Sequence, residues 1–199
     1  MSAAGGGRRS VEEQLARVLD AVRTLPGETR AIRDAAHRTL AEPATAAHDI
    51  PLFDNSAMDG FAVRAADVAA ASEENPVVLR VVADLPAGVS DDPPLAAGEA
   101  ARIMTGSPAP TAADAIVPFE DTAGGLADSL GEVRVLCAPA AAGAFIRRRG
   151  ADLRSGDAVV HAGERLGAFQ LSAAVAAGVE SVTCLLYTSP SPRDVEEYR

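Results

Sequence analysis

The sequence predicts an α+β fold in which a helical domain is interrupted by a small β-rich domain. Helix signals follow Ser10, short β-rich runs separated by Gly, Pro and Asp fill residues 76–136, and an apolar helix-like run covers Ala168 to Ala177. Helical patterns therefore stand on both sides of the β-rich runs. We expect a discontinuous helical domain of residues 10–50 and 143–183, with residues 51–142 inserted as the β-rich domain.

The helical domain is predicted to begin with two helices. Ser10 and Glu13 form a capping box, and Pro26-Gly27 is expected to end the first helix. Its apolar face is expected to pack in a core or a dimer, and consists of Val11, Leu15, Val18, Leu19 and Val22. A second helix is expected over Ala31 to Leu40, before Pro43. Its inward residues would be Ile32, Ala36 and Leu40. Residues 1–9 lack the apolar segment of a signal peptide and are expected to be a flexible leader.

A first polar motif runs from Pro51 to Arg64, P-L-F-D-N-S-A-M-D-G-F-A-V-R. Pro51 disfavours a helix upstream, so the segment should open as a turn at its Asp-Asn-Ser step, pinned to a core by apolar anchors. Those anchors are Phe53, Met58 and Phe61. Held close together, Asp54 and Asp59 would raise one pKa or bind a cation such as Mg2+. The alternative is an Asx turn followed by a helix cap.

A second motif, A-R-I-M-T-G-S-P-A-P, covers Ala101 to Pro110 and is followed by A-D-A-I-V-P-F-E from Ala113 to Glu120. The pattern predicts strand, turn, strand. The turn Thr105-Gly106-Ser107 would expose backbone N–H groups and two hydroxyls before Pro108 stops the ladder, and such a turn can cradle an oxyanion. The alternative is an ordinary hairpin corner.

A third motif, F-I-R-R-R-G-A-D, runs from Phe145 to Asp152. In an extended segment Arg147 and Arg149 face one side and Arg148 the other. Two guanidinium groups on one face suit a phosphate or a tetrahedral dianion, because arginine binds such groups bidentately. A solvated run of charges is the alternative.

Together, the order and content of these motifs resemble the MoeA family of molybdopterin molybdenumtransferases, which includes the E domain of gephyrin. The resemblance runs from about Val11 to Val182. The motifs that carry it are F-D-N-S-A-M-D-G-F-A-V-R, R-I-M-T-G, A-D-A-I-V with Glu120, and I-R-R-R-G-A-D. The family typically has Tyr at the place of Phe61.

The resemblance implies an enzyme that inserts molybdenum from molybdate into adenylylated molybdopterin, with release of AMP and a requirement for Mg2+. It also implies a linker domain and a lid domain in an elongated homodimer, with the molybdopterin adenylyltransferase of the same pathway as a further partner. Residues matching Asp59, Thr105, Arg147 and Asp152 are associated with activity in the family.

The candidate residues therefore fall into three groups. The catalytic candidates are Asp59, Thr105 and Asp152. The anion-binding candidates are Arg147, Arg149, Gly106 and Ser107. The metal candidates are Asp59 and, as a weaker candidate that we favour as a turn former, Asp54.

The C-terminus departs from the family. Members continue into an α/β domain that binds the pterin nucleotide and then a β-barrel, and both are absent here. In their place stands C-L-L-Y-T-S-P-S-P-R-D, Cys184 to Asp194, which resembles the translation of a transposase adapter. We expect residues 184–199 to be a non-native tail on a truncated reading, and the fragment to be inactive alone. A genuine disordered tail, a non-catalytic interaction or dimerisation module, and a tungsten-inserting relative are the alternatives.

Composition excludes several function classes. The formal charge of −10 argues against a nucleic-acid binder, and the absence of lysine excludes a lysine Schiff base within the chain. The two cysteines, Cys137 and Cys184, lack metal or redox spacing and are expected to be free thiols. The three histidines are scattered, so a zinc site has little support. No apolar stretch reaches the ~20 residues of a membrane span, and we expect a cytoplasmic protein.

Overall fold

The computed structural model describes residues 9–125 and 130–186, which form two compact units. The terminal unit contains the chain up to Thr45 and from Ala158 on, and the inserted unit contains residues 46–157. Residues 46–50 and 143–157, which the sequence assigns to the helical domain, group with the inserted unit. Their backbone bonds show why, since Ala46 N–H donates to the Asp157 carbonyl at 2.9 Å and Gly156 N–H donates to the Ala46 carbonyl at 2.8 Å.

Two small antiparallel sheets and one helix form the core of the terminal unit. Strand β1 (Gly27–Ala31) pairs with β11 (Ser181–Leu185), and β2 (Ala44–Thr45) pairs with β10 (Ala158–Val160). Helix α3 (Ala168–Ala176) forms where the sequence predicts it. The buried apolar residues of this unit include Leu40, Val160, Leu166, Ala174, Val182 and Cys184. Cys184 and Leu185, which the sequence assigns to a tail, are therefore the last residues of β11; the rest of that tail, from residue 187, lies outside the described residues.

The prediction of a helix over Ala31 to Leu40 is wrong. Ala31 ends β1 and pairs with Ser181, and the next N–H, that of Ile32, donates to the Glu180 carbonyl at 2.9 Å. Only one 3₁₀ turn, η1 (Ile32–Asp34), follows. Pairing with a distant strand has here overridden a helical spacing of apolar residues.

Helix α1 (Val11–Ala21) confirms the capping box: the Ser10 hydroxyl accepts the Glu13 N–H at 3.1 Å and the Glu13 carboxylate accepts the Ser10 N–H at 3.0 Å. The helix ends well before Pro26, with Val22 as its C-cap. None of its residues is buried. The apolar face predicted to pack in a core is thus exposed in this chain.

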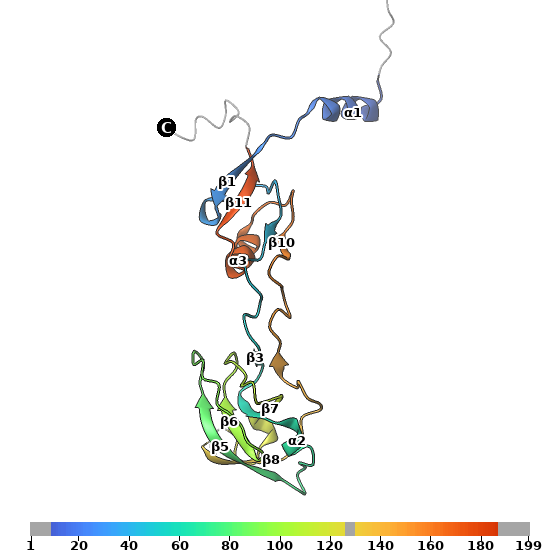
Figure 1. Ribbon diagram of the computed structural model, residues 1–199. Helices are drawn as coiled ribbons and strands as arrows, with labels where there is room; N and C mark the ends of the chain where they lie inside the picture. The colour runs from blue at the N-terminus through green and yellow to red at the C-terminus, as the bar shows by residue number, and fades with distance from the viewer. Residues whose placement is uncertain (1–8, 126–129, 187–199) are drawn as a thin grey trace, which may run out of the picture. The chain divides into compact units, whose positions relative to one another are not determined.

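The inserted unit contains a five-stranded sheet in the order β7-β4-β6-β5-β8. Figure 1 labels β5, β6, β7 and β8 of this sheet. Its neighbours are antiparallel except β5 and β6, which are parallel. The strands are β4 (Gly60–Val63), β5 (Val77–Leu85), β6 (Glu99–Ile103), β7 (Ala115–Pro118) and β8 (Gly131–Val135). The β-rich runs predicted within residues 76–136 are confirmed as the four strands β5, β6, β7 and β8, whereas β4 within the first motif was not predicted. Because β6 and β7 both pair with β4, they do not form the hairpin that the second motif suggests.

Both faces of this sheet are covered. Side chains alternate along β4, so Phe61 and Val63 enter one apolar cluster while Ala62 enters the other. Short elements complete the unit: α2 (Ala65–Val68), η2 (Phe119–Asp121), and the pair β3 (Asn55–Ser56) with β9 (Ile146–Arg147). This alternation also fixes which polar residues at the strand ends share a face.

The chain is mostly β, with three α-helices in its described part. The α+β class holds coarsely, but the prediction of a predominantly helical first domain is wrong, because its segments contribute β1, β2, β10 and β11. No helix in the described ranges has both the length and the apolar character needed to cross a bilayer.

Candidate functional site

Within the inserted unit, the structure brings the three polar motifs together. Strand β3 of the first motif pairs with β9 of the third, and Asn55 also bridges Pro108 of the second. Backbone bonds continue the junction: Ser56 N–H donates to the Ser107 carbonyl at 3.0 Å, and Ala109 N–H donates to the Asp54 carbonyl at 3.0 Å. Segments about 50 and 90 residues apart in the chain therefore share one short β junction.

Asp59 and Thr105 form a tight pair at this junction. One oxygen of Asp59, Oδ1, accepts both the backbone N–H and the hydroxyl of Thr105, each at 2.7 Å. Both residues are exposed, and the pair is anchored because the Asp59 carbonyl accepts the Phe119 N–H at 3.1 Å. The structure thus joins two of the three predicted catalytic residues.

The pKa of Asp59 lies below its usual range. The backbone N–H of Thr105 is the main cause, followed by its hydroxyl and the nearby positive charge of Arg102, while partial burial acts in the opposite direction. The pKa of Asp54 is also lowered, first by the Arg149 N–H and then by Arg148. Neither carboxylate therefore has the raised pKa considered for a close pair, because each has its own donors.

The turn Thr105-Gly106-Ser107 is not the predicted oxyanion cradle. Its three N–H groups all have protein acceptors: Thr105 donates to Asp59, Gly106 to the Ser56 carbonyl at 2.8 Å, and Ser107 to the Met104 carbonyl at 3.0 Å. Gly106 has φ +84°, a conformation that favours glycine. Ser107 is fully buried, and its hydroxyl has no hydrogen-bond partner in the described structure. Only the Thr105 hydroxyl is exposed, and it already binds Asp59.

The three arginines of the third motif also differ from the prediction. Strand β9 ends at Arg147, so the expected alternation of faces does not continue to Arg149. Arg148 Nη1 donates to Asp54 Oδ2 at 2.6 Å, and Arg149 Nε donates to Asp49 Oδ2 at 2.6 Å. Arg147 is exposed and makes no ion pair within the described ranges. It is therefore the member of the run that is open to an external anion.

Asp152 makes no hydrogen bond with Asp59 or Thr105 in the described structure. Its backbone N–H donates to the Ile50 carbonyl at 2.9 Å, which ties the motif to residues just before Pro51. Its side chain is exposed and accepts no hydrogen bond from the described residues. The structure thus leaves this carboxylate at the surface.

The described residues do not assemble a metal cage. They contain no group of three or more His, Cys, Asp or Glu placed to hold an ion. Each oxygen of Asp54 accepts a hydrogen bond, one from Arg148 Nη1 at 2.6 Å and the other from the Arg149 N–H at 2.7 Å, which favours a structural role for Asp54 over its weaker metal role. Of the two metal candidates, Asp59 keeps one oxygen without a protein donor in the described structure. Mg2+ is commonly held by one or two carboxylates together with waters and substrate phosphates, so Asp59 fits as a protein ligand of that kind.

Three participants were missed from the sequence. Asp49 binds Arg149 Nε and also accepts the Ser155 N–H at 2.9 Å. Ser56 supplies backbone groups to the second motif, and the positive charge of Arg102 contributes to the lowered pKa of Asp59. The signal for Arg102 was present, since it precedes Thr105 by three residues within R-I-M-T-G. Asp49 lies outside the motifs and gave no signal.

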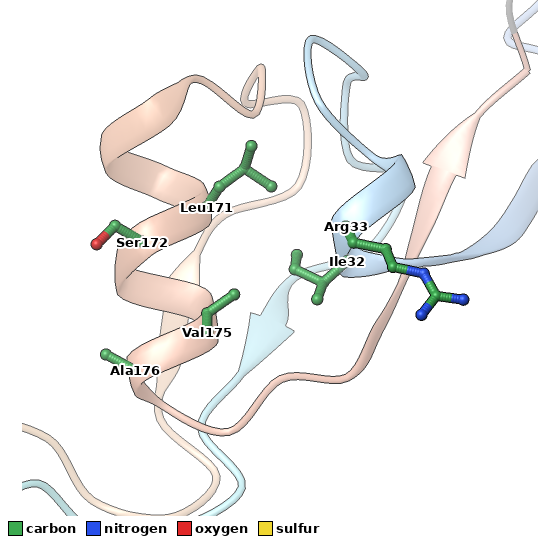
Figure 2. Close-up of a pocket in the computed structure, with 6 residues that line it drawn as sticks. All are labelled: Ile32, Arg33, Leu171, Ser172, Val175 and Ala176. Atoms are coloured by element: carbon green, nitrogen blue, oxygen red, sulfur yellow. The ribbon is translucent and has the colours of Figure 1, made fainter.

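Two of the hollows on the described surface bear on the site. One, of about 410 Å³, is lined by residues that include Phe53, Pro108 and Arg148, next to the motif junction. Phe53 is 43% exposed there and is not the core anchor that the sequence predicts, in contrast to the fully buried Phe61. The other, of about 430 Å³, lies in the terminal unit between η1 and α3. Figure 2 shows Leu171 and Val175 of α3 directed toward Ile32, with the Arg33 guanidinium pointing away. None of the residues that line this second hollow belongs to the three motifs.

Comparison with known proteins agrees with the geometry. The family model described as MoeA N-terminal region (domain I and II) matches residues 9–178. The chain is 41% identical over 177 residues to molybdopterin molybdenumtransferase 2 of Mycobacterium tuberculosis, covering 89% of the chain and 42% of the relative. It is 44% identical over 145 residues to molybdopterin molybdenumtransferase of Synechococcus elongatus, covering 71% of the chain and 34% of the relative.

Solved structures give the same result. A crystal structure of the molybdopterin biosynthesis MoeA protein from Pyrococcus horikoshii superposes with a TM-score of 0.74 at 35% identity, covering 87% of this chain and 43% of that one. A second solved structure, of a molybdopterin biosynthesis MoeA protein from Pyrococcus horikoshii OT3, gives a TM-score of 0.79 at 29% identity, covering 94% of this chain and 52% of that one. The chain thus spans about half or less of each relative. It belongs to the MoeA family, whose N-terminal region, domains I and II, it matches over residues 9–178.

Proposed function

We propose that this chain is the N-terminal part of an enzyme of molybdenum cofactor biosynthesis that inserts molybdenum from molybdate into adenylylated molybdopterin, releasing AMP. The observation that carries the proposal is the Asp59–Thr105 pair, in which one exposed carboxylate oxygen is fixed by two donors at 2.7 Å. Both relatives named above are molybdopterin molybdenumtransferases by name. Because the chain spans only part of their length, we expect it to need the remainder of such a protein for activity.

The chain's own groups suggest a division of roles. Asp59 is held ionised and fixed in direction by Thr105, and its second oxygen has no protein donor, so it can accept a proton or a hydrogen bond from substrate. Arg147 is the exposed guanidinium suited to molybdate or to a phosphate of the pterin substrate. Arg149 is already engaged by Asp49, and Gly106 and Ser107 support the turn that carries Thr105. Mg2+ would be held by the free oxygen of Asp59 together with waters and substrate phosphates, and no step is assigned to it.

The test uses a fusion in which this chain replaces the matching region of the Mycobacterium tuberculosis relative. The fusion is introduced into a bacterium lacking its own molybdenumtransferase, and molybdoenzyme activity is measured. We expect activity with the wild-type fusion and its loss in Asp59→Ala and Thr105→Ala. Lack of activity in a folded wild-type fusion, or wild-type insertion rates in a folded Asp59→Ala fusion, would contradict the proposal.

A matched control lies in the same unit. Thr111 donates its N–H to Asp92 Oδ1 and its hydroxyl to Asp92 Oδ2, each at 2.8 Å, on an exposed surface outside the motifs quoted above. Asp92→Ala and Thr111→Ala remove an interaction of the same kind. We expect these variants to retain activity, which would separate a role in the reaction from a general effect on stability.

A second candidate function, an interaction or dimerisation module, is favoured by one observation: the apolar face of α1 is exposed along its whole length. An isolated helix of 11 residues is marginal in water, so a partner surface would stabilise it. We propose a homodimer, with adenylylated molybdopterin and the molybdopterin adenylyltransferase as further partners of the complete protein. The two functions are compatible, since a dimer can carry the insertion site.

A further inference from the structure

Arg102 is a charged residue on a covered face of the five-stranded sheet. In β6 it lies between Phe61 of β4 and Asp84 of β5 in the strand register. Its side chain is only 20% exposed, and its Nε is buried without a hydrogen-bond partner in the described structure. Burying a guanidinium in this way costs free energy unless its charge is paired and its donors are hydrogen-bonded.

The contacts of the guanidinium are few. Its Nη1 lies 3.5 Å from Asp84 Oδ2, and its central carbon lies 5.8 Å from the centroid of the Phe119 ring. The Phe119 ring packs edge-on against Phe61, with centroids 5.3 Å apart and an interplanar angle of 90°. The aromatic pair therefore holds the guanidinium over the sheet by a cation–π contact.

The Phe119 residue that contacts the Arg102 guanidinium is also hydrogen-bonded to Asp59. Side chains alternate along a strand, so Asp59, two residues before Phe61, lies on the side of the sheet that carries Phe61 and Arg102. The Phe119 backbone N–H donates to the Asp59 carbonyl at 3.1 Å, so the residue that holds the guanidinium also anchors Asp59. Arg102 is also the positive charge that contributes to the low pKa of Asp59.

From this geometry we propose that Arg102 is a positioning residue that holds the Asp59 carboxylate against Thr105. Thr105 is three residues beyond Arg102 on the same segment, so one short stretch supplies both donors and the supporting charge. The importance of Arg102 for molybdenum insertion rests on the proposed function. The effect of Arg102 on the Asp59–Thr105 pair does not. A role in packing alone would be filled as well by an apolar side chain, because replacing a buried charge by an apolar group of similar volume is often neutral.

The first test measures hydrogen exchange at the Thr105 amide in the full chain, for Arg102→Met, Arg102→Lys and Asp84→Asn. We expect exchange at least about fivefold faster in Arg102→Met, a local opening of the bond to Asp59. Arg102→Lys should restore most of the protection, because it keeps the charge. Asp84→Asn removes the ion-pair partner of Arg102 but not its charge, and should leave Thr105 exchange within about twofold of wild type.

The amide of Leu79, buried in the same apolar cluster, reports global unfolding. If Leu79 and Thr105 accelerate equally in Arg102→Met, or if Thr105 exchange is unchanged, the positioning role is overturned. Should Arg102→Met fail to fold, Arg102→Gln, which keeps hydrogen-bonding groups without charge, replaces it with the same expected result.

A second measurement connects this role to the reaction. In the fusion protein described above, we expect Arg102→Met to lower kcat while leaving the KM for molybdate near the wild-type value, and Arg102→Lys to recover part of kcat. A raised KM with unchanged kcat would overturn the positioning role. An inactive wild-type fusion would instead overturn the proposed function, and the exchange experiment would still decide the role of Arg102.

Discussion

The carboxylate of Asp54 accepts a hydrogen bond from the Arg148 guanidinium at 2.6 Å, across 94 residues of chain. Its other oxygen accepts the Arg149 backbone N–H at 2.7 Å. One side chain of the first motif therefore holds two consecutive residues of the third. Asp54 therefore links the first motif to the third through hydrogen bonds, which differs from the local turn role expected from the sequence.

We expect Asp54→Ala to lower the free energy of unfolding by about 1 kcal/mol, the low value reflecting solvent screening of a pair whose acid is 38% exposed. Exchange of the Arg149 amide should accelerate, because it loses its acceptor. Urea unfolding and amide exchange measure the two effects. Asp91→Ala, at an exposed acid with no hydrogen bond in the described structure, should change neither. Unchanged hydrogen exchange at the Arg149 amide in Asp54→Ala would contradict this linking role of Asp54.

Acid should destabilise the protein. The carboxyl pKa is lowered by hydrogen bonds, first of all from a backbone N–H, at Asp49, Asp54, Asp59, Asp92 and Glu99. The unfolded chain then binds more protons than the folded one, so stability rises with pH. The stability that these carboxylates contribute should be fully present above their unfolded pKa values of about 4. This contribution should be lost as the pH falls below those values.

Urea unfolding between about pH 7 and pH 3 checks this pH dependence. The Asp54→Asn variant should lose less stability on acidification than the wild type, because one of the contributing groups is gone. A free energy of unfolding that rises as the pH falls from about 5 to 3 would contradict the sign.

Gly60 and Gly106 should respond to alanine for different reasons. A Cβ at Gly60 would lie 2.1 Å from the Val117 carbonyl oxygen in β7, so the paired backbones must separate. A Cβ at Gly106 meets nothing within 4 Å, but φ is +84°. We expect Gly60→Ala to cost about 2–3 kcal/mol and Gly106→Ala about 1 kcal/mol. Urea unfolding measures both, and an equal or reversed order would contradict the close approach of β4 and β7.

The two thiols should differ in reactivity. Cys137 is exposed, whereas Cys184 is buried in β11 and burial raises the pKa of its thiol. In native protein with an Ellman-type reagent, we expect one thiol to react rapidly and the second only in denaturant. Cys137→Ser should abolish the rapid phase. Two rapid thiols in native protein would show that the end of β11 is not paired as described.

The exposed face of α1 should mediate self-association. We expect Leu15→Glu and Leu19→Glu to shift a homodimer to monomer in light scattering, while Glu12→Gln, on the first turn, leaves the dimer intact. A monomeric wild-type chain at high micromolar concentration would contradict the dimer proposal for this chain.

Local signals predicted local structure well. The capping box at Ser10, helix α3 and the four β-rich runs all form as predicted, because their determinants lie within a few residues. Strand β1, with the sequence G-E-T-R-A, has no such signal. It is a strand because β11 supplies its hydrogen bonds, and a partner about 150 residues away cannot be inferred from local spacing.

The site follows the same rule. The residue types and their grouping into motifs indicated which segments carry the chemistry, and Asp59 and Thr105 do lie together. What the motifs did not indicate is how hydrogen bonds are distributed among them. The N–H groups of the Thr105 turn are bound by Asp59, Ser56 and Met104, and only the folded structure shows that they are unavailable to a ligand.

The pairing of β1 with β11 determines when each unit can fold during synthesis. All residues of the inserted unit, 46–157, leave the ribosome before β11, so that unit can form its sheet while β1 still lacks a partner. The terminal unit must wait until residues 181–185 emerge, and its Gly27–Ala31 segment stays unpaired in the meantime. An unpaired strand edge is prone to wrong pairing, so nascent chains halted before residue 181 should be more open to protease near residue 27 than released chains.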